Sequence, residues 1–149
     1  MAEKKSIRFE IATLERTLLK QEVLQATIPT ESGEITVLPE HIPLVSIIKP
    51  GVIEIKTLDG NTEIIAISGG FVEVLREKIV ILADTAERAE ELDESRIIEA
   101  RKTAEEAKVE ALTQENYDLS AVAARLDFEL ARDRALHKWR KLKNINPGK

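Results

Sequence analysis

Residues 69–84 read GGFVEVLREKIVILAD, and they divide the chain into two parts with different structural signals. Arg76, Glu77 and Lys78 are suited to the tip of a hairpin between strands over residues 71–75 and 79–82. Before residue 71 lie five of the six glycines and four of the five prolines, whereas residues 71–146 contain neither type. Frequent turn-forming residues predict short strands in the first part, and their absence permits long helices in the second.

The first part alternates apolar and polar residues with a period of two, as half-buried strands do. Ile7, Phe9 and Ile11 alternate with Arg8 and Glu10. The same spacing recurs in two further sets of apolar residues: Leu24, Ala26 and Ile28, and then Ile53 and Ile55.

Turn signals at short intervals determine the expected architecture of this part. Asp59-Gly60-Asn61 is typical of a tight turn between strands over 53–58 and 63–67. Gly69-Gly70 does not open a helix, so it favours a bulge or a close approach of two segments over a phosphate-binding loop. Many short strands at this spacing predict an antiparallel β-sandwich or barrel over residues 1–85.

Residues 86–149 carry a helical period instead. Apolar residues spaced by three and four form a narrow stripe that is mainly alanine: Ile97, Ala100, Ala104, Ala107 and Ala111. Residues 115–117 predict a turn, after which Asp118 is suited to cap a second helix. The two helices predict an antiparallel hairpin, so the expected fold class is α+β.

The second predicted helix has two apolar faces, whereas a simple hairpin needs only one. At about 100° per residue, one side holds Ala121, Ala124, Phe128, Ala131, Ala135 and Trp139. The roughly opposite side holds Leu119, Val122, Leu126 and Leu130. One face packs on the first helix, and the other requires a further surface, either the β-domain or a partner protein.

The two helices also differ in charge. Residues 87–115 contain ten acidic and five basic residues, whereas residues 125–149 contain three acidic and eight basic residues. Opposite charge is consistent with antiparallel pairing, and it gives the C-terminal end a basic surface suited to an acidic partner. Solvated helix faces with ion pairs between residues four apart explain the same pattern.

Composition argues against several kinds of function. The net charge of -5 argues against nucleic-acid binding, and the lack of cysteine excludes thiolate nucleophiles and thiolate metal sites. His41 and His137 each lack a nearby second histidine, and no arrangement of residues suggests a catalytic centre. No apolar run reaches the ~20 residues of a membrane span, and residues 1–8 are too polar for a secretory signal. We therefore expect no catalytic residues, no metal and no direct membrane insertion.

Five motifs occur in order along the chain: Glu31–Glu34 with Val37–Leu44, Lys49–Val52, Ser68–Val74, Leu82–Glu87 and Leu92–Arg96. Together they resemble the epsilon subunit of rotary F-type ATP synthases, which is called delta in mitochondria. The order and spacing of the motifs make the match specific, and it extends from Phe9 through the second helix. The resemblance implies a β-sandwich followed by a helical hairpin, in agreement with the periodicities above.

The resemblance also implies a non-catalytic rotor subunit of the bacterial type, peripheral at the cytoplasmic face of the plasma membrane. Its β-domain would bind the gamma subunit and the ring of c-subunits and couple proton flow to ATP synthesis. Its hairpin would either fold on the β-domain or extend along gamma to the catalytic alpha and beta subunits, where it inhibits ATP hydrolysis. The lack of an Arg- and Ser-rich leader favours a bacterial member over an imported mitochondrial one, and a plastid-encoded member would lack such a leader as well.

Two sets of contact residues follow from the resemblance. Glu34 and His41 match positions that meet the loops of the c-ring, although a solvated turn carboxylate and a turn residue before Pro43 would fit the same positions. The basic residues expected to face the catalytic subunits are Arg125, Arg132, Arg134, Lys138, Arg140 and Lys141.

Some bacterial members bind ATP between the two helices. The residues here that match their motif are Glu87, Leu92, Asp93, Arg96 and Arg132. Ile97 stands where the motif has alanine, and Phe128 stands where it has an arginine, so we expect ATP binding to be weak or absent and no other cofactor. Asp93 and Arg96 would alternatively cap the first helix and pair within it.

Two other classes of function are alternatives to the rotor subunit, although no residues support the second of them, an enzyme. A free-standing adaptor or chaperone would capture partner helices with the hairpin and would show no preference for a gamma-type stalk. A small enzyme would place β-domain carboxylates in a deep pocket and would be active as an isolated chain.

Overall fold

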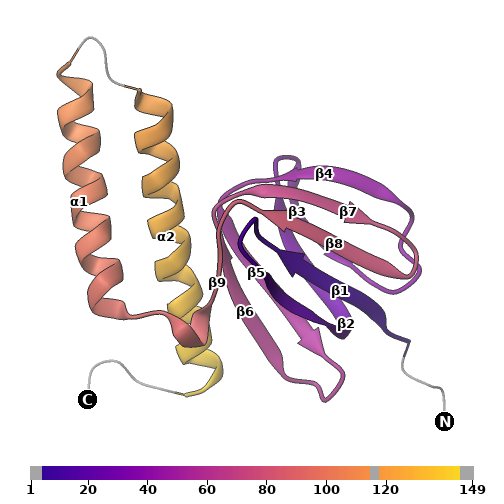
Figure 1. Ribbon diagram of the computed structural model, residues 1–149. Coiled ribbons are helices and arrows are strands. Elements are labelled where there is room, and N and C mark those ends of the chain that lie inside the picture. The colour runs from indigo at the N-terminus through magenta and orange to yellow at the C-terminus, as the bar shows by residue number, and fades with distance from the viewer. Residues whose placement is uncertain (1–4, 115–117, 145–149) are drawn as a thin grey trace.

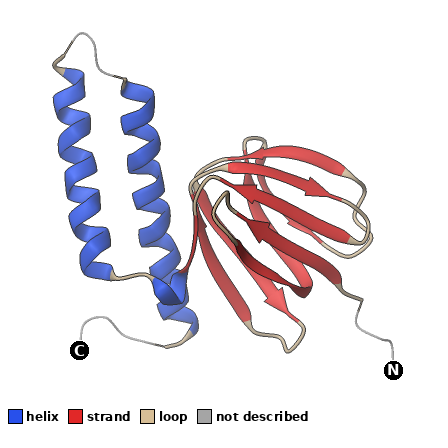
Figure 2. Ribbon diagram, viewed as in Figure 1, coloured by secondary structure: helices blue, strands red, loops and turns tan. Residues whose placement is uncertain are grey.

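The computed structural model describes residues 5–114 and 118–144, and it consists of a β-domain followed by two long helices (Figures 1 and 2). The strands are β1 (Ile7–Ala12), β2 (Thr17–Thr30), β3 (Gly33–Val37), β4 (Leu44–Ile48), β5 (Gly51–Thr57), β6 (Thr62–Ile67), β7 (Gly70–Val74), β8 (Lys78–Ala83) and β9 (Ala86–Arg88). A short 3-10 helix, η1 (Ala89–Glu91), leads to α1 (Glu94–Leu112) and α2 (Leu119–Leu142). The predicted α+β fold, a β-domain with a C-terminal helical hairpin, is confirmed.

The strands form one hydrogen-bonded sheet that curls around its core. Their order is β1-β8-β7-β4-β2-β5-β6-β9, with β3 paired to β2. Because β1 also pairs with β2, and Thr30 of β2 pairs with Ile48 of β4, the first five strands in this order close into a ring. The prediction of antiparallel pairing holds for the described strands except β1 and β8, which run parallel.

The core lies inside this curled sheet. The inward positions predicted from the alternation are fully buried at Ile7, Phe9, Ile11, Ala26, Ile28, Ile53 and Ile55. Leu24 is only half-buried, contrary to the prediction, because β2 is irregular between Val23 and Gln25 and Val23 takes the inward position. A bulge of this kind displaces the alternation by one residue.

The β-domain extends past the boundary predicted at residue 85. β9 pairs antiparallel with β6, so that Ala86 lies opposite Ile67 and Arg88 lies opposite Ile65. The Arg88 guanidinium also donates to the Leu18 carbonyl oxygen at 3.3 Å. The sheet therefore continues through Arg88, and the helical part begins after it.

Both long helices begin at aspartate caps. The Asp93 side chain accepts from the Ser95 backbone N–H at 2.9 Å, and Asp118 accepts from the N–H groups of Ser120 and Ala121, as predicted for Asp118. The alanine stripe of α1 is buried at Ile97, Ala104 and Ala111 and half-buried at Ala100 and Ala107. The predicted turn at 115–117 lies outside the described residues. Over the described ranges, neither helix is both long enough and apolar enough to cross a bilayer.

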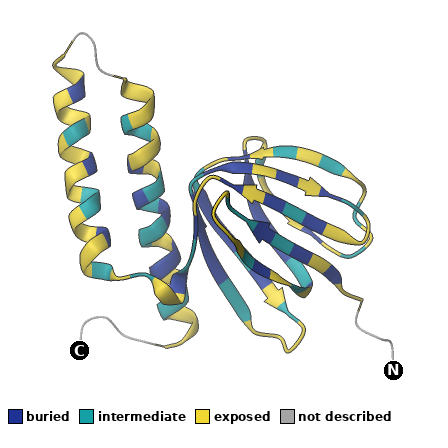
Figure 3. Cartoon of the chain, viewed as in Figure 1, coloured by how far each residue is buried: buried dark blue, intermediate teal, exposed yellow. Residues whose placement is uncertain are grey.

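α2 lies between α1 and the β-domain, where it packs on β5 and β6 (Figure 1). Phe128, Ala135 and Trp139 contact the β-domain, so the chain's own sheet covers the second apolar face of this helix. Ala121 and Ala124 share that predicted face but are exposed, because the N-terminal end of α2 projects beyond the sheet (Figure 3).

The opposite side of α2 faces α1. Leu126 is buried on this side. Asp133 and Arg140 follow it at intervals of seven residues, so the three residues lie on one side of the helix. Asp133 pairs with Arg101 of α1 at 3.6 Å, and Arg140 pairs with Glu94 of α1 at 2.8 Å. Of the predicted opposite face, Leu126 is buried and Val122 and Leu130 are half-buried, whereas Leu119 is exposed, so the prediction of a second packed face holds only in part.

Candidate interaction surfaces

The junction between α2 and the β-domain rests on a small apolar cluster. Its buried members are Val52, Ile64, Ala66, Ala89 and Ala135, with Leu92, Phe128 and Trp139 packed at its edge. This cluster is separate from the main core of the β-domain. The hairpin is thus attached to a β-domain that has its own core.

Arg132 of α2 joins the hairpin to the β-domain electrostatically. Its Nε donates to a carboxylate oxygen of Glu87 on β9 at 2.9 Å. Its Nη1 donates to both carboxylate oxygens of Glu129, at 3.2 and 3.0 Å. The Arg132 guanidinium also lies 5.7 Å from the centre of the Phe128 ring, which is within cation–π range.

The six basic residues expected to form one inhibitory face do not share a face in this structure. At about 100° per residue, Arg125, Arg132 and Arg140 lie on one side of α2, and Arg134, Lys138 and Lys141 lie on the other. In-chain carboxylates already pair with Arg132, Arg140 and Lys138, the last through Glu54 of β5 at 3.2 Å. Arg125, Arg134 and Lys141 are exposed and form no ion pair within the described residues.

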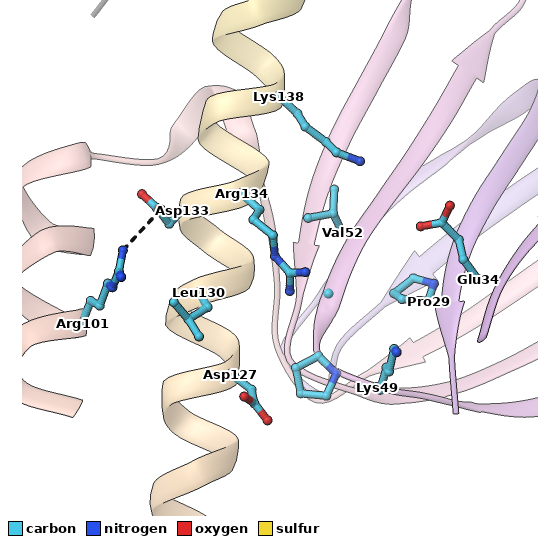
Figure 4. A pocket seen from close by; sticks show the side chains of 12 residues that line it. Pro29, Glu34, Lys49, Val52, Arg101, Asp127, Leu130, Asp133, Arg134 and Lys138 are labelled. Atoms are coloured by element: carbon cyan, nitrogen blue, oxygen red, sulfur yellow. Dashed lines mark ion pairs between the residues drawn. The ribbon is translucent and has the colours of Figure 1, made fainter. Parts of the chain in front are cut away.

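A cleft of about 840 Å³ opens between α2 and the β-domain (Figure 4). Glu34 and Lys49 line it from the β-domain, and Asp127, Arg134 and Lys138 line it from α2. Because both acidic and basic side chains line its walls, the cleft has no single sign of charge and does not favour an anionic or a cationic ligand.

The structure brings the residues matched to the ATP motif only partly together. Glu87 and Arg132 are in contact, as described above. Asp93 instead caps α1, and its Oδ2 lies 4.0 Å from the Nε of Arg96, whose side chain is 84% exposed. Leu92 packs against the junction cluster. Asp93 and Arg96 thus adopt the alternative arrangement of a helix cap and its pair.

Of the two residues matched to c-ring contacts, Glu34 lies within β3 and His41 lies after the end of that strand. Glu34 is exposed near the start of β3, whereas half-buried His41 follows the end of that strand, and its Nδ1 lies 2.6 Å from the Ile42 carbonyl oxygen. Between them, Glu40 adopts a φ of 66°, in the left-handed region. The hydrogen bond and charge of Lys5, 2.9 Å away, hold the pKa of Glu40 below its usual value.

An exposed apolar row crosses three strands that do not pack on the helices. Ile47 of β4 is paired with Phe71 of β7, and Phe71 is paired with Leu82 of β8. All three side chains are exposed, and the neighbouring row places Glu73 between Val45 and Val80. We call the row Ile47–Phe71–Leu82 the outer apolar row.

Sequence reasoning missed the outer apolar row and the role of Glu129. The signal for the row is the uninterrupted apolar run 79–82, since four consecutive apolar residues in a strand must place some of them on the outer face. The spacing of three between Glu129 and Arg132 on one helix is a local signal for their ion pair, whereas the contact of Arg132 with Glu87 joins residues 45 positions apart. Within the described residues, no group of three His, Cys, Asp or Glu side chains is placed to hold a metal ion.

Comparisons with known proteins agree with this architecture. Residues 6–89 match the family described as "ATP synthase, Delta/Epsilon chain, beta-sandwich domain". An ATP synthase epsilon chain from Chloroflexus aggregans is 42% identical over 134 residues, which cover 89% of this chain and 94% of that protein. An ATP synthase epsilon chain from Bordetella petrii is 37% identical over 141 residues, which cover 95% and 99%.

A solved structure shows the same likeness in three dimensions. A chain of the mitochondrial ATP synthase of Euglena gracilis, determined with OSCP, F1 and the c-ring, superimposes with a TM-score of 0.76 at 26% identity. The superposition covers 89% of this chain and 82% of that one. The sequence motifs, the β-domain with its helical hairpin and the relatives at this identity lead to one conclusion: the chain belongs to the ATP synthase epsilon-chain family.

Proposed function

We propose that the chain is a non-catalytic, central-stalk subunit of a bacterial-type ATP synthase, peripheral at the cytoplasmic face of the plasma membrane. Its β-domain couples rotation driven by proton flow to ATP synthesis, and its hairpin slows ATP hydrolysis. The observation that carries this proposal is the mode of attachment of the hairpin. α2 packs on the β-domain through a cluster of its own, separate from the core that stabilises the β-domain.

Coupling requires a surface that holds the rotor stalk. The outer apolar row is the best candidate for contact with the gamma subunit, because exposed apolar side chains in register across three strands are typical of an interface centre. Glu73 in the adjacent row suits a basic residue on the partner. Glu34 and His41 remain the proposed contacts with the c-ring loops.

Inhibition requires the hairpin to leave the β-domain and reach the catalytic alpha and beta subunits. Movement of the hairpin would release Arg132 and Lys138 from Glu87 and Glu54, and it would expose Phe128 and Trp139. Lys138, Phe128 and Trp139 would then be free to meet acidic and apolar surfaces elsewhere, and Arg132 would keep only Glu129 of its own helix as a partner.

The experiment that tests the proposal measures ATP hydrolysis by an F-type catalytic complex that contains gamma but lacks epsilon. The full chain is compared with a shortened chain that ends at Leu92. This cut keeps β9, which a cut at residue 85 would remove from the edge of β6. Binding of each chain is measured separately, by co-sedimentation with the complex.

If both chains bind and only the full chain slows hydrolysis, the proposal stands in both parts. If both bind and neither slows hydrolysis, the inhibitory part is wrong and the coupling part stands. If neither binds a gamma-containing complex, the coupling part is wrong, and a free-standing adaptor becomes the better explanation of the hairpin.

A further inference from the structure

Arg132 is held between two carboxylates that come from different parts of the chain. Glu87 belongs to β9 at the edge of the sheet, and Glu129 belongs to α2, one helical turn before Arg132. The side chains of Arg132 and Glu129 are only 18% and 8% exposed, and that of Glu87 is 34% exposed. The cluster is therefore largely withdrawn from water at the place where the helix meets the sheet.

The charges of this cluster depend on one another. A carboxylate as buried as Glu129 requires a cation, because an unpaired buried charge is strongly unfavourable. Both carboxylates share the single guanidinium of Arg132, so loss of that guanidinium would leave two negative groups near each other. Phe128 adds a further contact, since its ring lies beside the guanidinium and also packs on the junction cluster.

Only some of the ion pairs of α2 reach the β-domain. Arg132–Glu87 and Lys138–Glu54 do so, whereas Arg140–Glu94 and Asp133–Arg101 connect α2 with α1. The pairs between the helices survive a movement of the hairpin as a unit, and the two pairs to the β-domain do not.

We infer that Arg132, Glu87 and Glu129 form an ionic latch, in which the chain's own charged side chains hold the hairpin on the β-domain. Lys138–Glu54 is a weaker second contact, because both its side chains are more exposed and the pair is better screened by solvent. The closed latch keeps the charge of Arg132 away from acidic partners. This inference rests on the proposed movement of the hairpin.

The test measures opening of the junction in the isolated full chain, which has no cysteine of its own. One reporter is Ala135→Cys, at a fully buried position of α2 in the junction cluster. Its alkylation rate by a small thiol reagent is proportional to the fraction of molecules with an open junction. A second reporter, Ala26→Cys, lies in the core of the β-domain and reacts only when that domain unfolds.

Three substitutions are compared on each reporter: Arg132→Gln, Lys138→Gln and Arg125→Gln. Arg125→Gln is the matched control, because it removes the same charge from an exposed position of the same helix. We expect Arg132→Gln to raise the alkylation rate at position 135 about tenfold or more. We expect Lys138→Gln to raise it by less than about fivefold and Arg125→Gln to leave it unchanged.

Two results would overturn the latch. Equal rates at position 135 for Arg132→Gln and Arg125→Gln would show that the cluster does not hold the hairpin. A parallel rise at position 26 would show that Arg132 stabilises the whole fold and not the junction. Both results concern the isolated chain, so they are distinct from a failure to inhibit the catalytic complex. A rise at position 135 alone supports the latch.

Discussion

Phe71 on β7 lies directly opposite Leu82 on β8 in the sheet register, and both side chains face solvent, with exposed fractions of 57% and 61%. Ile47 extends the pair to β4. Three exposed apolar side chains in one row form an apolar surface, and its contact with water is unfavourable in free energy. The row therefore has the character of a binding surface that is incomplete in the isolated chain.

The first prediction concerns the Phe71 side chain at the centre of this row. We expect Phe71→Ser to weaken binding to a gamma-containing catalytic complex by about 2 kcal/mol, roughly a 30-fold rise in Kd, because central aromatic residues dominate interfaces. Titration of the labelled chain into the complex measures the change. Leu58→Ser is the control, since Leu58 is a similarly exposed apolar residue after β5. Equal weakening by both substitutions would contradict the proposed position of the interface.

The second prediction concerns Gly70 at the start of β7. Its φ is +141°, and a Cβ built there would overlap the Leu82 carbonyl oxygen and lie 2.9 Å from the Cα of Ala83. Gly33 also has a positive φ, of +118°, but open space around it. We expect Gly33→Ala to cost about 1–3 kcal/mol of unfolding free energy from backbone strain alone. Gly70→Ala adds a steric clash, so urea unfolding should show a clearly larger loss of unfolding free energy for this substitution. Equal losses for Gly33→Ala and Gly70→Ala would be evidence against the close approach.

The sequence predicts this close approach at Gly69-Gly70 and the pattern of burial along β1, because both depend on neighbours a few residues apart. It does not predict the shift at Leu24, since the bulge arises where β2 passes from its partner β1 to its partner β5. The parallel pairing of β1 with β8 depends on segments about seventy residues apart, and no local period reports such a contact.

The candidate site divides in the same way. The sequence indicates that Asp118 is a cap and that α2 has two apolar faces, because helix periodicity is local. The match to the ATP motif groups Arg132 with Glu87, but it does not indicate that they pair directly, since this contact depends on how α2 packs against the sheet. The basic residues of α2 can be divided only by assigning each to a side of the helix. This places Arg132 on one side and Arg134 and Lys138 on the other, so the predicted basic face is two faces.

The third prediction concerns Ala104, which is fully buried in the stripe of α1. A larger side chain at this position has no space unless α1 moves, so we expect Ala104→Leu to destabilise the hairpin by about 1–3 kcal/mol. Thermal unfolding followed by helical circular dichroism measures the loss. Thr103→Leu is the control, since it adds a leucine at an exposed neighbouring position. A neutral Ala104→Leu would contradict close packing at the stripe.

The fourth prediction concerns the turn between β5 and β6. Hydrogen bonds from the Thr57 hydroxyl and the Asn61 backbone N–H favour the charged form of Asp59 and hold its pKa below the usual value. A lowered pKa means that Asp59 contributes stability at neutral pH, and that this contribution is lost as pH falls below the ordinary aspartate range through the folded-state pKa. Asp59→Asn should therefore lower the melting temperature at pH 7 and have little effect near pH 2. If Asp59→Asn changed the melting temperature by the same amount at pH 7 and pH 2, this role of Asp59 would be contradicted.

The last prediction concerns ATP. Arg132 is paired with Glu87 and Glu129, Asp93 caps α1, and the buried side chain of Ile97 fills space where the motif has an alanine. A nucleotide phosphate would have to displace two carboxylates from one guanidinium, at a position where Phe128 supplies no second positive charge. We expect calorimetric titration of the full chain with Mg-ATP to show no binding at micromolar affinity. If micromolar binding does occur, and if Arg132→Gln weakens it, then Arg132 binds the nucleotide in place of its two carboxylates, and ATP competes with the latch instead of being excluded by it.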